Sequence, residues 1–429
     1  MRKFVPFLCV FGLMLLVASP LYAGAIVNKS NQSADYFRTL NRNAGTDYAD
    51  IIVFNPAGTS KMEDGGYLKL DVMYITKDYS NTISSAVPPG TIGELTSDEP
   101  STLPGFFAMY KQGKWAGFFA FTIPGGGGEV KWNQGNARTV GASLRFTGGA
   151  TGALPQSLIA DSVYRGYTLG GSFAINEVWS IAAGVRYIDA YKEATITLGG
   201  PNPFPIIPTV VDYEQDADGW SGFIGLNIAP SDALNIGLTY IHKTKLDFET
   251  NLKRDDTGGV IGGLVPFLNQ GAKQQEDLPG QINAGVSYKF TPKLRVETDL
   301  TYYLEKEATW EGRLNGEGNS WEWGLMGEWT FNPQWKASLG YLHSEIDVNA
   351  NNLLPEAPEL TANSIGAGAV FSPTSSWAIT FGAVKVFYDS KTSTQTSAFT
   401  FAPAGTNTKK TAGASSPVSS GSSYKSRCA

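Results

Sequence analysis

Histidine and cysteine side chains, which most often bind metals or act in proton transfer and nucleophilic chemistry, are scarce in this chain. His242 and His343 are the only histidines, and neither lies in a recognisable local motif. The two cysteines are Cys9 and Cys428, so the sequence predicts neither a disulfide framework nor a cysteine-based metal site. A Gly-x-Ser-x-Gly nucleophile elbow and a Walker phosphate loop are both absent, and Gly125–Gly128 lacks the lysine of such a loop. These features favour a protein that is not an enzyme and that uses no metal or cofactor.

Four carboxylates alternate along one predicted strand, at Asp212, Glu214, Asp216 and Asp218. Alternate residues of a strand point to the same side, so these carboxylates share one face. Calcium is held by about six to eight oxygens that surround it, and a row on one extended face does not wrap an ion. We therefore interpret the row as a solvated face, either lumenal or at a rim.

The charge balance excludes a nucleic-acid partner. Of the 429 residues only 17% are charged, the formal net charge is −6 at pH 7, and local runs of like charge are absent. Nucleic-acid-binding proteins instead carry a basic patch or stripe.

Residues 1–23 have the pattern of a secretory signal peptide. Arg2 and Lys3 precede an apolar run from Phe4 to Val17, and small residues around Ala23 suit cleavage. The apolar run is too short to span a bilayer, and no later stretch approaches about 18 consecutive apolar residues. The sequence therefore predicts an exported chain without helical membrane spans.

From Gly66 onwards the hydrophobic pattern has a period of two. In residues 294–304, for example, leucine, valine and tyrosine alternate with arginine, glutamate and aspartate. Such alternation is typical of half-buried strands. Residues 24–65, in contrast, are polar and weakly periodic, apart from a possible short helix from Ser33 to Leu40.

Connections between the predicted strands alternate strictly between short and long. Short turns lie at residues 111–114, 176–177, 230–232, 291–293, 332–334 and 372–375, with longer polar or Gly/Pro-rich loops between them. Transmembrane barrels have short periplasmic turns and longer extracellular loops. We therefore predict an all-β fold, a transmembrane antiparallel β-barrel of about fourteen strands over residues 66–429 with both termini periplasmic.

Aromatic residues gather close to the predicted short turns, where a barrel carries an aromatic girdle. They are Trp115, Trp179, Trp321, Trp335, Trp377, Phe290, Phe331 and Phe371. About fourteen strands enclose a space too wide for lining side chains alone to fill. Since the polar segment 24–65 has no other place to fold, we predict that it plugs the lumen.

The tetrapeptide Asn55-Pro56-Ala57-Gly58 lies shortly before the first predicted strand. Proline removes a backbone donor and pushes the preceding asparagine towards an extended conformation, so the stretch is a poor helix or strand interior. In the context of a signal peptide, a polar segment and about fourteen strands, with Asp277-Leu-Pro-Gly280 and residues 360–366 opening late strands, the chain resembles the FadL-type outer-membrane transporters (OmpP1/FadL/TodX-like). The resemblance covers nearly the whole mature chain up to about residue 405. It departs at residues 38–42, where many members carry a Gly- and Ala-rich run.

The resemblance implies a monomeric barrel whose N-terminal segment, residues 24–65, is a hatch, with Asn55, Pro56, Ala57 and Gly58 as its gating residues. It also implies transport of long-chain fatty acids or other hydrophobic compounds by passive diffusion. The ligand would leave sideways into the membrane through a kink in the third strand. In this chain the third predicted strand, residues 115–123, runs into Pro124, Gly125 and Gly126. Proline and glycine permit a bend, so this run is either the kink or the start of the next loop.

Two apolar runs lie inside predicted external loops, where exposed apolar patches usually mark binding sites. We expect them to capture hydrophobic ligands, although they could equally pack together as a loop core. The candidate residues are Phe204, Ile206, Ile207, Val260, Ile261, Leu264, Val265, Phe267 and Leu268.

The last residues, 408–429, do not resemble a closing strand. They show no alternation of large apolar residues, Pro417 interrupts them, and the chain ends in Ala429 instead of an aromatic residue. We therefore treat the final strand as doubtful, with a frameshift in the source gene as one hypothesis.

Together these observations predict a multi-pass protein of the outer membrane of a Gram-negative bacterium. Its partners would be hydrophobic small molecules, fatty acids or aromatic hydrocarbons, and the surrounding lipid and lipopolysaccharide. The alternative is a general or solute-specific porin, which would have a continuous wet channel instead of a filled lumen. An adhesin is favoured only by the long loops, and a barrel lipase would need a nucleophile paired with a histidine.

Overall fold

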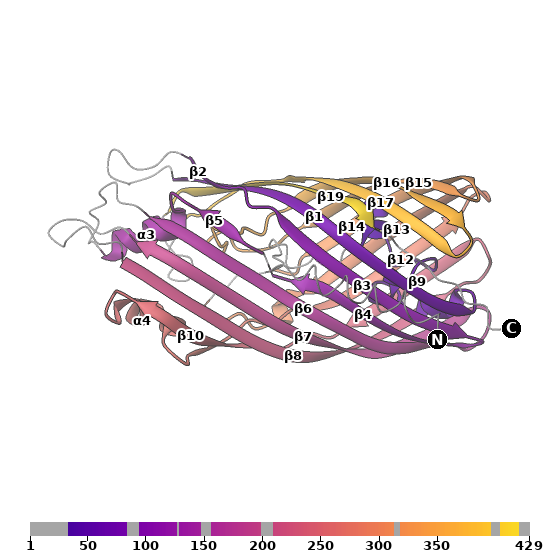
Figure 1. The fold of residues 1–429 in the computed structure, drawn as a ribbon, viewed down its shortest axis with the longest axis horizontal. Helices are drawn as coiled ribbons and strands as arrows, with labels where there is room; N and C mark the ends of the chain where they lie inside the picture. Colours follow the sequence, from indigo (N-terminus) through magenta and orange to yellow (C-terminus); the bar gives the residue numbers. More distant parts are fainter. Residues whose placement is uncertain are drawn as a thin grey trace, which may run out of the picture.

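The computed structural model describes residues 33–83, 94–126, 128–146, 156–198, 209–312, 318–395 and 404–419, and its strands form one closed antiparallel sheet (Figure 1). The first strand, β1 (Gly65–Ile83), pairs with β3 (Ser101–Gln112) on one side and with β19 (Thr406–Ser419) on the other. A closed sheet can pair its backbone donors and acceptors without water, as a hydrocarbon environment requires. The predicted signal peptide lies outside the described residues.

Fourteen strands make the wall of the barrel in the part of the chain that is described. Besides β1, β3 and β19 they are β4 (Trp115–Gly125), β6 (Ser157–Ala174), β7 (Trp179–Leu198), β8 (Thr209–Ile228), β9 (Leu234–Ile241), β12 (Gly280–Lys289), β13 (Leu294–Leu304), β14 (Trp321–Asn332), β15 (Trp335–Glu345), β16 (Ala362–Thr374) and β17 (Trp377–Tyr388). Five further strands continue the course of a wall strand beyond an interruption: β2 (Glu94–Ser97), β5 (Val130–Trp132), β10 (Asp247–Asp255), β11 (Lys273–Gln275) and β18 (Lys391–Thr392). The predicted antiparallel barrel of about fourteen strands is confirmed.

The two ends of the barrel differ as the sequence predicts. Tight hairpins close one end, which we call the turn end; it lies on the right in Figure 1. The long connections gather at the opposite loop end, with α3 (Ala137–Phe146), α4 (Val260–Leu264) and the 3₁₀ helix η3 (Pro266–Leu268). A further 3₁₀ turn, η4 (Glu305–Glu307), follows β13. None of the helices in the described ranges is long and apolar enough to cross a bilayer.

The outer surface of the wall is apolar and carries two levels of aromatic side chains. Near the turn end these include Trp115, Trp179, Phe290, Phe331, Trp335 and Trp377, all at least 42% exposed. Trp220 forms part of the second level, eight residues along β8 from Ile228, which pairs with Trp179. At about 3.3 Å per residue and a strand tilt near 40°, this separation spans about 20 Å of the barrel axis, close to the height of a membrane-facing band. The prediction that Trp321 belongs to the girdle near the short turns is wrong. Trp321 begins β14 and lies at the loop end beside His343.

The row of alternating carboxylates on β8 faces outwards. Asp216 and Asp218 are exposed, whereas the intervening Gln215 and Ala217 are buried towards the lumen. Glu214 forms an ion pair of 2.8 Å with Lys253 on β10. Because Trp220 lies on the same face closer to the turn end, the row belongs to the outer rim at the loop end and not to the lumen.

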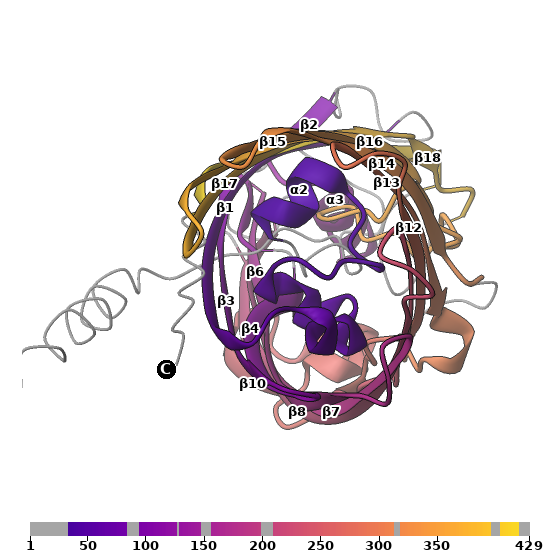
Figure 2. The ribbon, with the colours of Figure 1, turned by 90° about the vertical axis from the view of Figure 1, so that its right-hand side faces the viewer.

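Residues 33–64, which we call the plug, lie inside the barrel (Figure 2). The plug contains α2 (Ala34–Thr39) and two 3₁₀ helices, η1 (Ala49–Val53) and η2 (Pro56–Lys61). Helix α2 begins because the hydroxyl of Ser33 accepts a hydrogen bond of 3.0 Å from the backbone N–H of Tyr36. It ends at Leu40, whose φ of 55° is left-handed. The predicted helix from Ser33 to Leu40 is confirmed, and residues 24–32 lie outside the described residues.

Strand β19 closes the barrel although its sequence lacks large apolar residues. Ten of its residues pair with β1, from Ser415 with Tyr74 to Thr406 with Ile83. Its pairing with β17 shifts register between Thr380 and Gly382, close to Pro417. Thus part of the doubtful segment, up to Ser419, forms the closing strand in this structure, because backbone pairing does not need a large side chain.

Candidate functional site: the plugged lumen

The tetrapeptide 55–58 joins the plug to the barrel wall. Asn55 is fully buried, and its Nδ2 donates to the carbonyl oxygen of Gly45 at 3.0 Å and to Oδ1 of Asn227 at 2.7 Å. Asn227, on β8, also bonds Asn235 on β9 at 2.8 Å. One side chain therefore connects two parts of the plug with two neighbouring wall strands.

The other residues of the tetrapeptide also lie against the wall. The carbonyl oxygen of Ala57 accepts a hydrogen bond of 3.1 Å from the hydroxyl of Ser180 on β7. A Cβ added to Gly58 would lie 2.5 Å from Nδ2 of Asn55, so glycine leaves the room that the asparagine needs. Pro56 borders a small cavity that is described below.

Replacing Asn55 with alanine is expected to leave the barrel folded, loosen the plug and lower ligand uptake. The change leaves the buried carbonyl of Gly45 without its Asn55 donor, which costs about 1–3 kcal/mol, and removes one of the two donors to Oδ1 of Asn227. Hydrogen exchange of the plug amides and uptake by cells measure the two effects. Asn251→Ala, on β10 outside the plug, serves as the control. Unchanged exchange and uptake would make the tetrapeptide an ordinary turn.

A buried charge network fixes the first helix of the plug. Arg38 is fully buried, with its Nε 2.7 Å from Oδ1 of Asp35 and its Nη1 bonded to Glu328 on β14 and, at 3.1 Å, to Ser338 on β15. Lys69 on β1 approaches the other oxygen of Asp35 at 2.8 Å. The helix is thus tied to β1 and to β14 and β15, which lie far apart in the sequence, and each charge has an opposite charge beside it, as burial demands.

A second part of the network holds the bend that follows α2. The guanidinium of Arg42 contacts Asp50 at 2.7 Å and Asp47 at 2.8 Å, both within the plug. Asp299 on β13 accepts the backbone N–H groups of Arg42 and Asn43 at 2.6 and 2.8 Å. A wall carboxylate therefore satisfies backbone donors that no helix or strand pairs.

The charge state of Asp35 follows from its neighbours. Burial raises the pKa of this carboxyl, but Lys69, Arg38 and Arg42 more than offset burial and hold the pKa below its ordinary value. A carboxyl with a depressed pKa stabilises the folded form above its unfolded pKa, near about 3.9, and loses this contribution as pH falls through the folded pKa. The Asp35 contacts should therefore persist across the neutral and mildly acidic range.

A row of inward-facing glycines lies beneath the plug. A Cβ added to Gly340 would lie 1.9 Å from the backbone oxygen of Thr39, and one added to Gly237 would lie 1.9 Å from that of Asn43. The plug backbone therefore rests directly on the backbone of the wall, where only glycine fits. The glycines at which an added Cβ would come within 3.1 Å of a plug atom are Gly225, Gly237, Gly285, Gly324, Gly340, Gly366, Gly368 and Gly382.

The wall is interrupted between β3 and β4. Pairing of the two strands ends at Phe121, whereas residues 101–105 of β3 still pair with β1. Beyond Phe121, β4 stays with β6 but shifts register between Thr122 and Gly125. The third wall strand therefore leaves one neighbour at the position where the sequence predicts either a kink or a loop.

Pro124, Gly125 and Gly126 form this departure. Gly126 has a φ of 91°, and a Cβ on it would lie 2.5 Å from the carbonyl oxygen of Ser162 on β6. Ile123 packs in one apolar cluster with Leu103 of β3. The side chain just before the bend thus belongs to the same buried cluster as the segment of β3 that β4 no longer pairs with.

The apolar loop 260–268 packs against the loop end of the barrel. Ile261, Val265 and Leu268 are buried in a cluster with Leu158 and Tyr213, whereas Val260 is 51% exposed. The expectation of an open apolar patch therefore applies to Val260 alone among these four, and the loop-core alternative describes the other three. Phe204, Ile206 and Ile207 lie outside the described residues, as does the side chain of Leu264.

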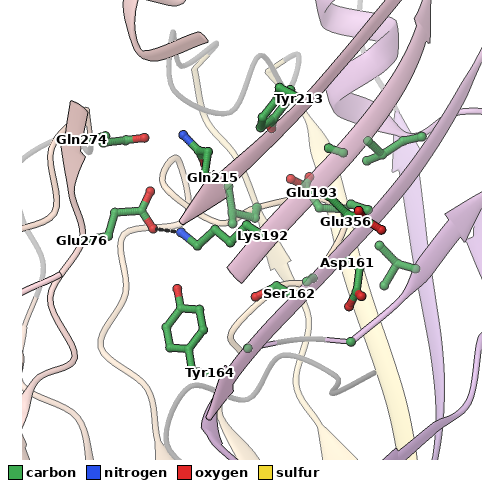
Figure 3. Close-up of a pocket in the computed structure, with 18 of the residues that line it drawn as sticks. Asp161, Ser162, Tyr164, Lys192, Glu193, Tyr213, Gln215, Gln274, Glu276 and Glu356 are labelled. Atoms are coloured by element: carbon green, nitrogen blue, oxygen red, sulfur yellow. Dashed lines mark hydrogen bonds and ion pairs between the residues drawn. The ribbon is translucent and has the colours of Figure 1, made fainter. Parts of the chain in front are cut away.

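An outer cavity of about 200 Å³ lies inside the loop-end half of the barrel (Figure 3). Its walls combine apolar groups, among them Leu158 and the predicted capture residue Phe267, with charged ones. Lys192 forms an ion pair with Glu276, and its Nζ lies 3.9 Å from the ring centroid of Phe248. Gly126 and Gly128 also line the cavity, so it borders the bend that follows β4.

A second, inner cavity of about 20 Å³ lies between the plug and the wall. Ile52, Val53 and Pro56 of the plug form one side, and Phe223 and Ile241 contribute apolar surface from β8 and β9. Arg186, Thr122, Thr168 and Thr239 supply its polar groups. Over the described residues, no set of three or more His, Cys, Asp and Glu side chains is arranged to bind a metal.

Sequence reasoning missed the charge network, the glycine row and Arg186. In the sequence, Arg38 and Arg42 stand out only because many family members have a Gly- and Ala-rich run there. Their partners on the wall, Glu328 and Asp299, are hundreds of residues away in the chain. Inward charges such as Glu297 and Asp299 are visible as one polar strand face, but the sequence does not show what they contact.

The sequence matches the family described as outer membrane protein transport protein (OMPP1/FadL/TodX) over residues 14–421. Among solved structures, a Pseudomonas aeruginosa FadL homologue is similar with a TM-score of 0.68 at 16% identity, covering 92% of this chain and 98% of the homologue. The Pseudomonas putida toluene transporter TodX gives 0.60 at 12% identity, covering 87% and 94%. The Ralstonia pickettii toluene transporter TbuX gives 0.57 at 14%, covering 87% and 95%. At these identities the likeness shows a shared fold. A search among curated proteins found no match.

Proposed function

The chain belongs to the family of outer membrane transport proteins that includes OMPP1, FadL and TodX, and on this basis we propose that it carries hydrophobic small molecules inwards by passive diffusion. The barrel would sit as a multi-pass monomer in the outer membrane of a Gram-negative bacterium, with lipid and lipopolysaccharide around its apolar belt. Long-chain fatty acids and aromatic hydrocarbons are the candidate ligands.

The observation that carries the proposal is that the outer cavity borders the interruption of the wall. Gly126 and Gly128 line this cavity and also follow the point where β4 parts from β3. A hydrophobic molecule in the cavity therefore lies next to the place where the ladder between two wall strands stops. We propose that the ligand leaves there, sideways into the membrane, and that Pro124, Gly125 and Gly126 shape the exit.

The plug supports a gated transporter over the alternative of an open porin. Residues 33–64 fill the lumen, and most of their side chains are buried. Water and polar solutes would need a continuous channel, which the plug obstructs. We propose that the plug acts as a hatch and that Asn55, Pro56, Ala57 and Gly58 form its gating part, because they touch both the wall and the inner cavity.

The loop residues would act in ligand capture at two levels. Phe267 lines the outer cavity and can contact a ligand directly, and Val260 is exposed at the loop end. Ile261, Val265 and Leu268 would support the capture surface by holding the loop in place. Leu264, Phe204, Ile206 and Ile207 complete the proposed set.

Uptake by living cells tests the proposal. A Gram-negative host that lacks its own transporter of this class is supplied with labelled oleate or labelled toluene, with and without expression of the chain. We expect faster uptake of at least one compound in the expressing cells. Equal uptake of both compounds with and without expression would overturn the transport function.

Replacing Gly126 with valine is expected to reduce uptake by at least about fivefold while the barrel still folds. Valine at a φ of 91°, facing the Ser162 carbonyl, costs about 1–3 kcal/mol of strain and forces the bend to move. Gly117→Val is the matched control, because Gly117 lies on β4 with no atom within 4 Å of an added Cβ. If both variants transport equally, the bend is not part of the route.

A further inference from the structure

The outer cavity is lined by more carboxylates than cationic groups. Among the described residues that line it, the cationic ones are Arg138 and Lys192, and each already has a carboxylate partner. Arg138 lies 3.2 Å from Glu356, and Lys192 forms its ion pair with Glu276. The acidic residues of the lining are Asp161, Glu193, Glu276, Asp277, Glu356 and Glu359. The formal charge of this lining is therefore negative.

Asp161 is buried in this lining without an ion-pair partner. It lies on β6, is only 7% exposed, and its Oδ1 has no hydrogen-bond partner. No lysine, arginine or histidine nitrogen in the described ranges lies within 4 Å of its carboxylate. Lys77 on β1 attracts it from farther away, but the Nζ of Lys77 donates to the hydroxyl of Ser101 at 2.9 Å and to the carbonyl oxygen of Glu129 at 3.3 Å. Because buried charges are normally paired, Asp161 is suited to accept a further donor.

Glu356 provides a second acceptor in the same cavity. It is 9% exposed, and its Oε2 has no hydrogen-bond partner although its Oε1 contacts Arg138. Figure 3 shows Asp161 and Glu356 among the residues that line the cavity. Hydrogen bonds from a cationic donor to a carboxylate are stronger than those from a neutral donor. Since both cations of the described lining are already paired, such a donor would come from a ligand.

Aromatic side chains line the cavity together with the carboxylates. Cations bind over the faces of aromatic rings, and this part of the barrel already contains such contacts. The Nζ of Lys192 lies 3.9 Å from the ring centroid of Phe248 and 5.9 Å from that of Tyr164. The aromatic residues of the lining are Tyr164, Tyr213, Phe267 and Trp310. A ligand with a ring and an ammonium group would use both kinds of side chain, whereas an acid would be repelled by the carboxylates.

The cavity has room for one small ring with a short substituent. Its volume of about 200 Å³ exceeds the roughly 150 Å³ of a protein cavity that binds benzene. The side chains of Lys192 and Glu276 keep 19% and 23% of their surface exposed, so solvent reaches this lining. An aromatic amine of one ring therefore fits both the volume and the charge of the cavity.

We propose that the outer cavity binds small aromatic ammonium ions, with Asp161 as the anionic partner of the ammonium group and Glu356 as a further acceptor. The inference rests on the proposed transport function and adds a ligand class that differs from fatty acids and hydrocarbons. The site prefers an aromatic amine to a neutral or acidic compound of the same size. Such amines are apolar apart from one charged group, so they remain within the hydrophobic small molecules of the proposed function.

Binding of three compounds that share one ring tests the proposal. The purified full chain in lipid nanodiscs is titrated at neutral pH with benzylamine, which is then protonated as lysine is, and separately with benzyl alcohol and with benzoate. Empty nanodiscs give the background from partition into lipid. We expect benzylammonium to bind at least about tenfold more tightly than benzyl alcohol, the effect of a hydrogen bond between charged groups. Benzoate should bind more weakly than either.

Variants of Asp161 show whether its charge causes the preference. Asp161→Asn keeps the shape of the side chain and removes the charge, so it should weaken benzylammonium at least about tenfold and leave benzyl alcohol unchanged. Asp161→Glu keeps the charge and should retain part of the preference. The matched control is Asp189→Asn, because the Asp189 side chain is 44% exposed on the neighbouring strand β7 and pairs with Arg165 at 3.0 Å. It should keep the wild-type preference.

The outcomes separate this site from the transport function. Equal binding of benzylammonium and benzyl alcohol by the wild type, or an undiminished preference in Asp161→Asn, would overturn the ammonium site and leave the transport function standing. Removing an unpaired buried charge should not impair folding, and Asp161→Glu provides a second variant that keeps the charge. Absence of uptake of both oleate and toluene by cells would instead overturn the transport function on which the inference rests.

Discussion

The Arg38→Met variant should retain a folded barrel around a plug that is no longer held in place. Arg38 is fully buried, and methionine leaves Glu328 and Asp35 with one cationic partner fewer each. Removing one member of a buried ion network costs about 3–5 kcal/mol. This loss falls on the docking of the plug, because the wall strands keep their own backbone ladders. Amide hydrogen exchange in residues 34–62, measured by mass spectrometry, should accelerate by about 100-fold or more.

The charge network provides its own controls. Arg165→Met removes the half-exposed pair with Asp189 on the outside of the wall, which should change stability by only about 0–1 kcal/mol and leave plug exchange unaltered. The double variant Arg38→Met/Glu328→Gln should recover part of the loss, because one of the two carboxylates that lose Arg38 as a partner is also removed. Slow plug exchange in Arg38→Met would show that the remaining contacts, among them the glycine row, Asn55, Lys69 and Asp299, hold the plug without Arg38.

The wall of the barrel could be predicted from the sequence because the alternation of residues along each strand shows which of its faces is apolar and which is polar. In residues 294–304 the leucine face meets the outside and the charged face meets the plug, so a period of two is visible without any partner. The turn lengths then indicate which strands are neighbours, since only antiparallel neighbours can be joined by short turns. Both signals are local, and both were sufficient for the fold.

The candidate site could not be predicted because its contacts are not local. Arg38 meets Glu328 across 290 residues of sequence, and Asp299 meets the backbone of Arg42 across 257. No periodicity links such positions, and a charged side chain in a polar segment is normally solvated. Arg186 was equally hidden, since nothing in the sequence shows that an arginine on a strand is buried with its Nε left without a hydrogen-bond partner.

One local inference was wrong, and another left two alternatives open, for related physical reasons. Trp321 adjoins a connection in the sequence, but each strand has two ends, and this tryptophan belongs to the loop end. For Ile261, Val265 and Leu268 the sequence left open a ligand-capture surface and a packed loop core, and the structure buries these three side chains in a cluster with residues of α3 and β6–β8. In both cases the residue type and its place beside a connection were read correctly. The sequence does not show which part of the barrel lies next to these residues.

Replacing Gly340 with leucine is expected to displace the plug more strongly than any single loss of a hydrogen bond. The added Cβ would lie 1.9 Å from the backbone oxygen of Thr39, and a backbone atom cannot move aside as a side-chain tip can. Overpacking of this kind costs about 1–3 kcal/mol even where side chains can adjust. The plug must therefore rise from β15, which also lengthens the contact between Arg38 and Ser338. Exchange in residues 34–44 should accelerate, and cells should become permeable to a labelled polar sugar.

The matched control for this prediction is Gly327→Leu on the neighbouring strand β14. Gly327 pairs with Leu339, one residue from Gly340, but no atom lies within 4 Å of a Cβ added to it. The two substitutions add the same side chain at the same level of the barrel, one towards the plug and one away from it. If only Gly340→Leu opens the lumen, close backbone contact keeps the plug in place. If neither variant leaks, the plug tolerates displacement from the glycine row, and the ion network must be the stronger restraint.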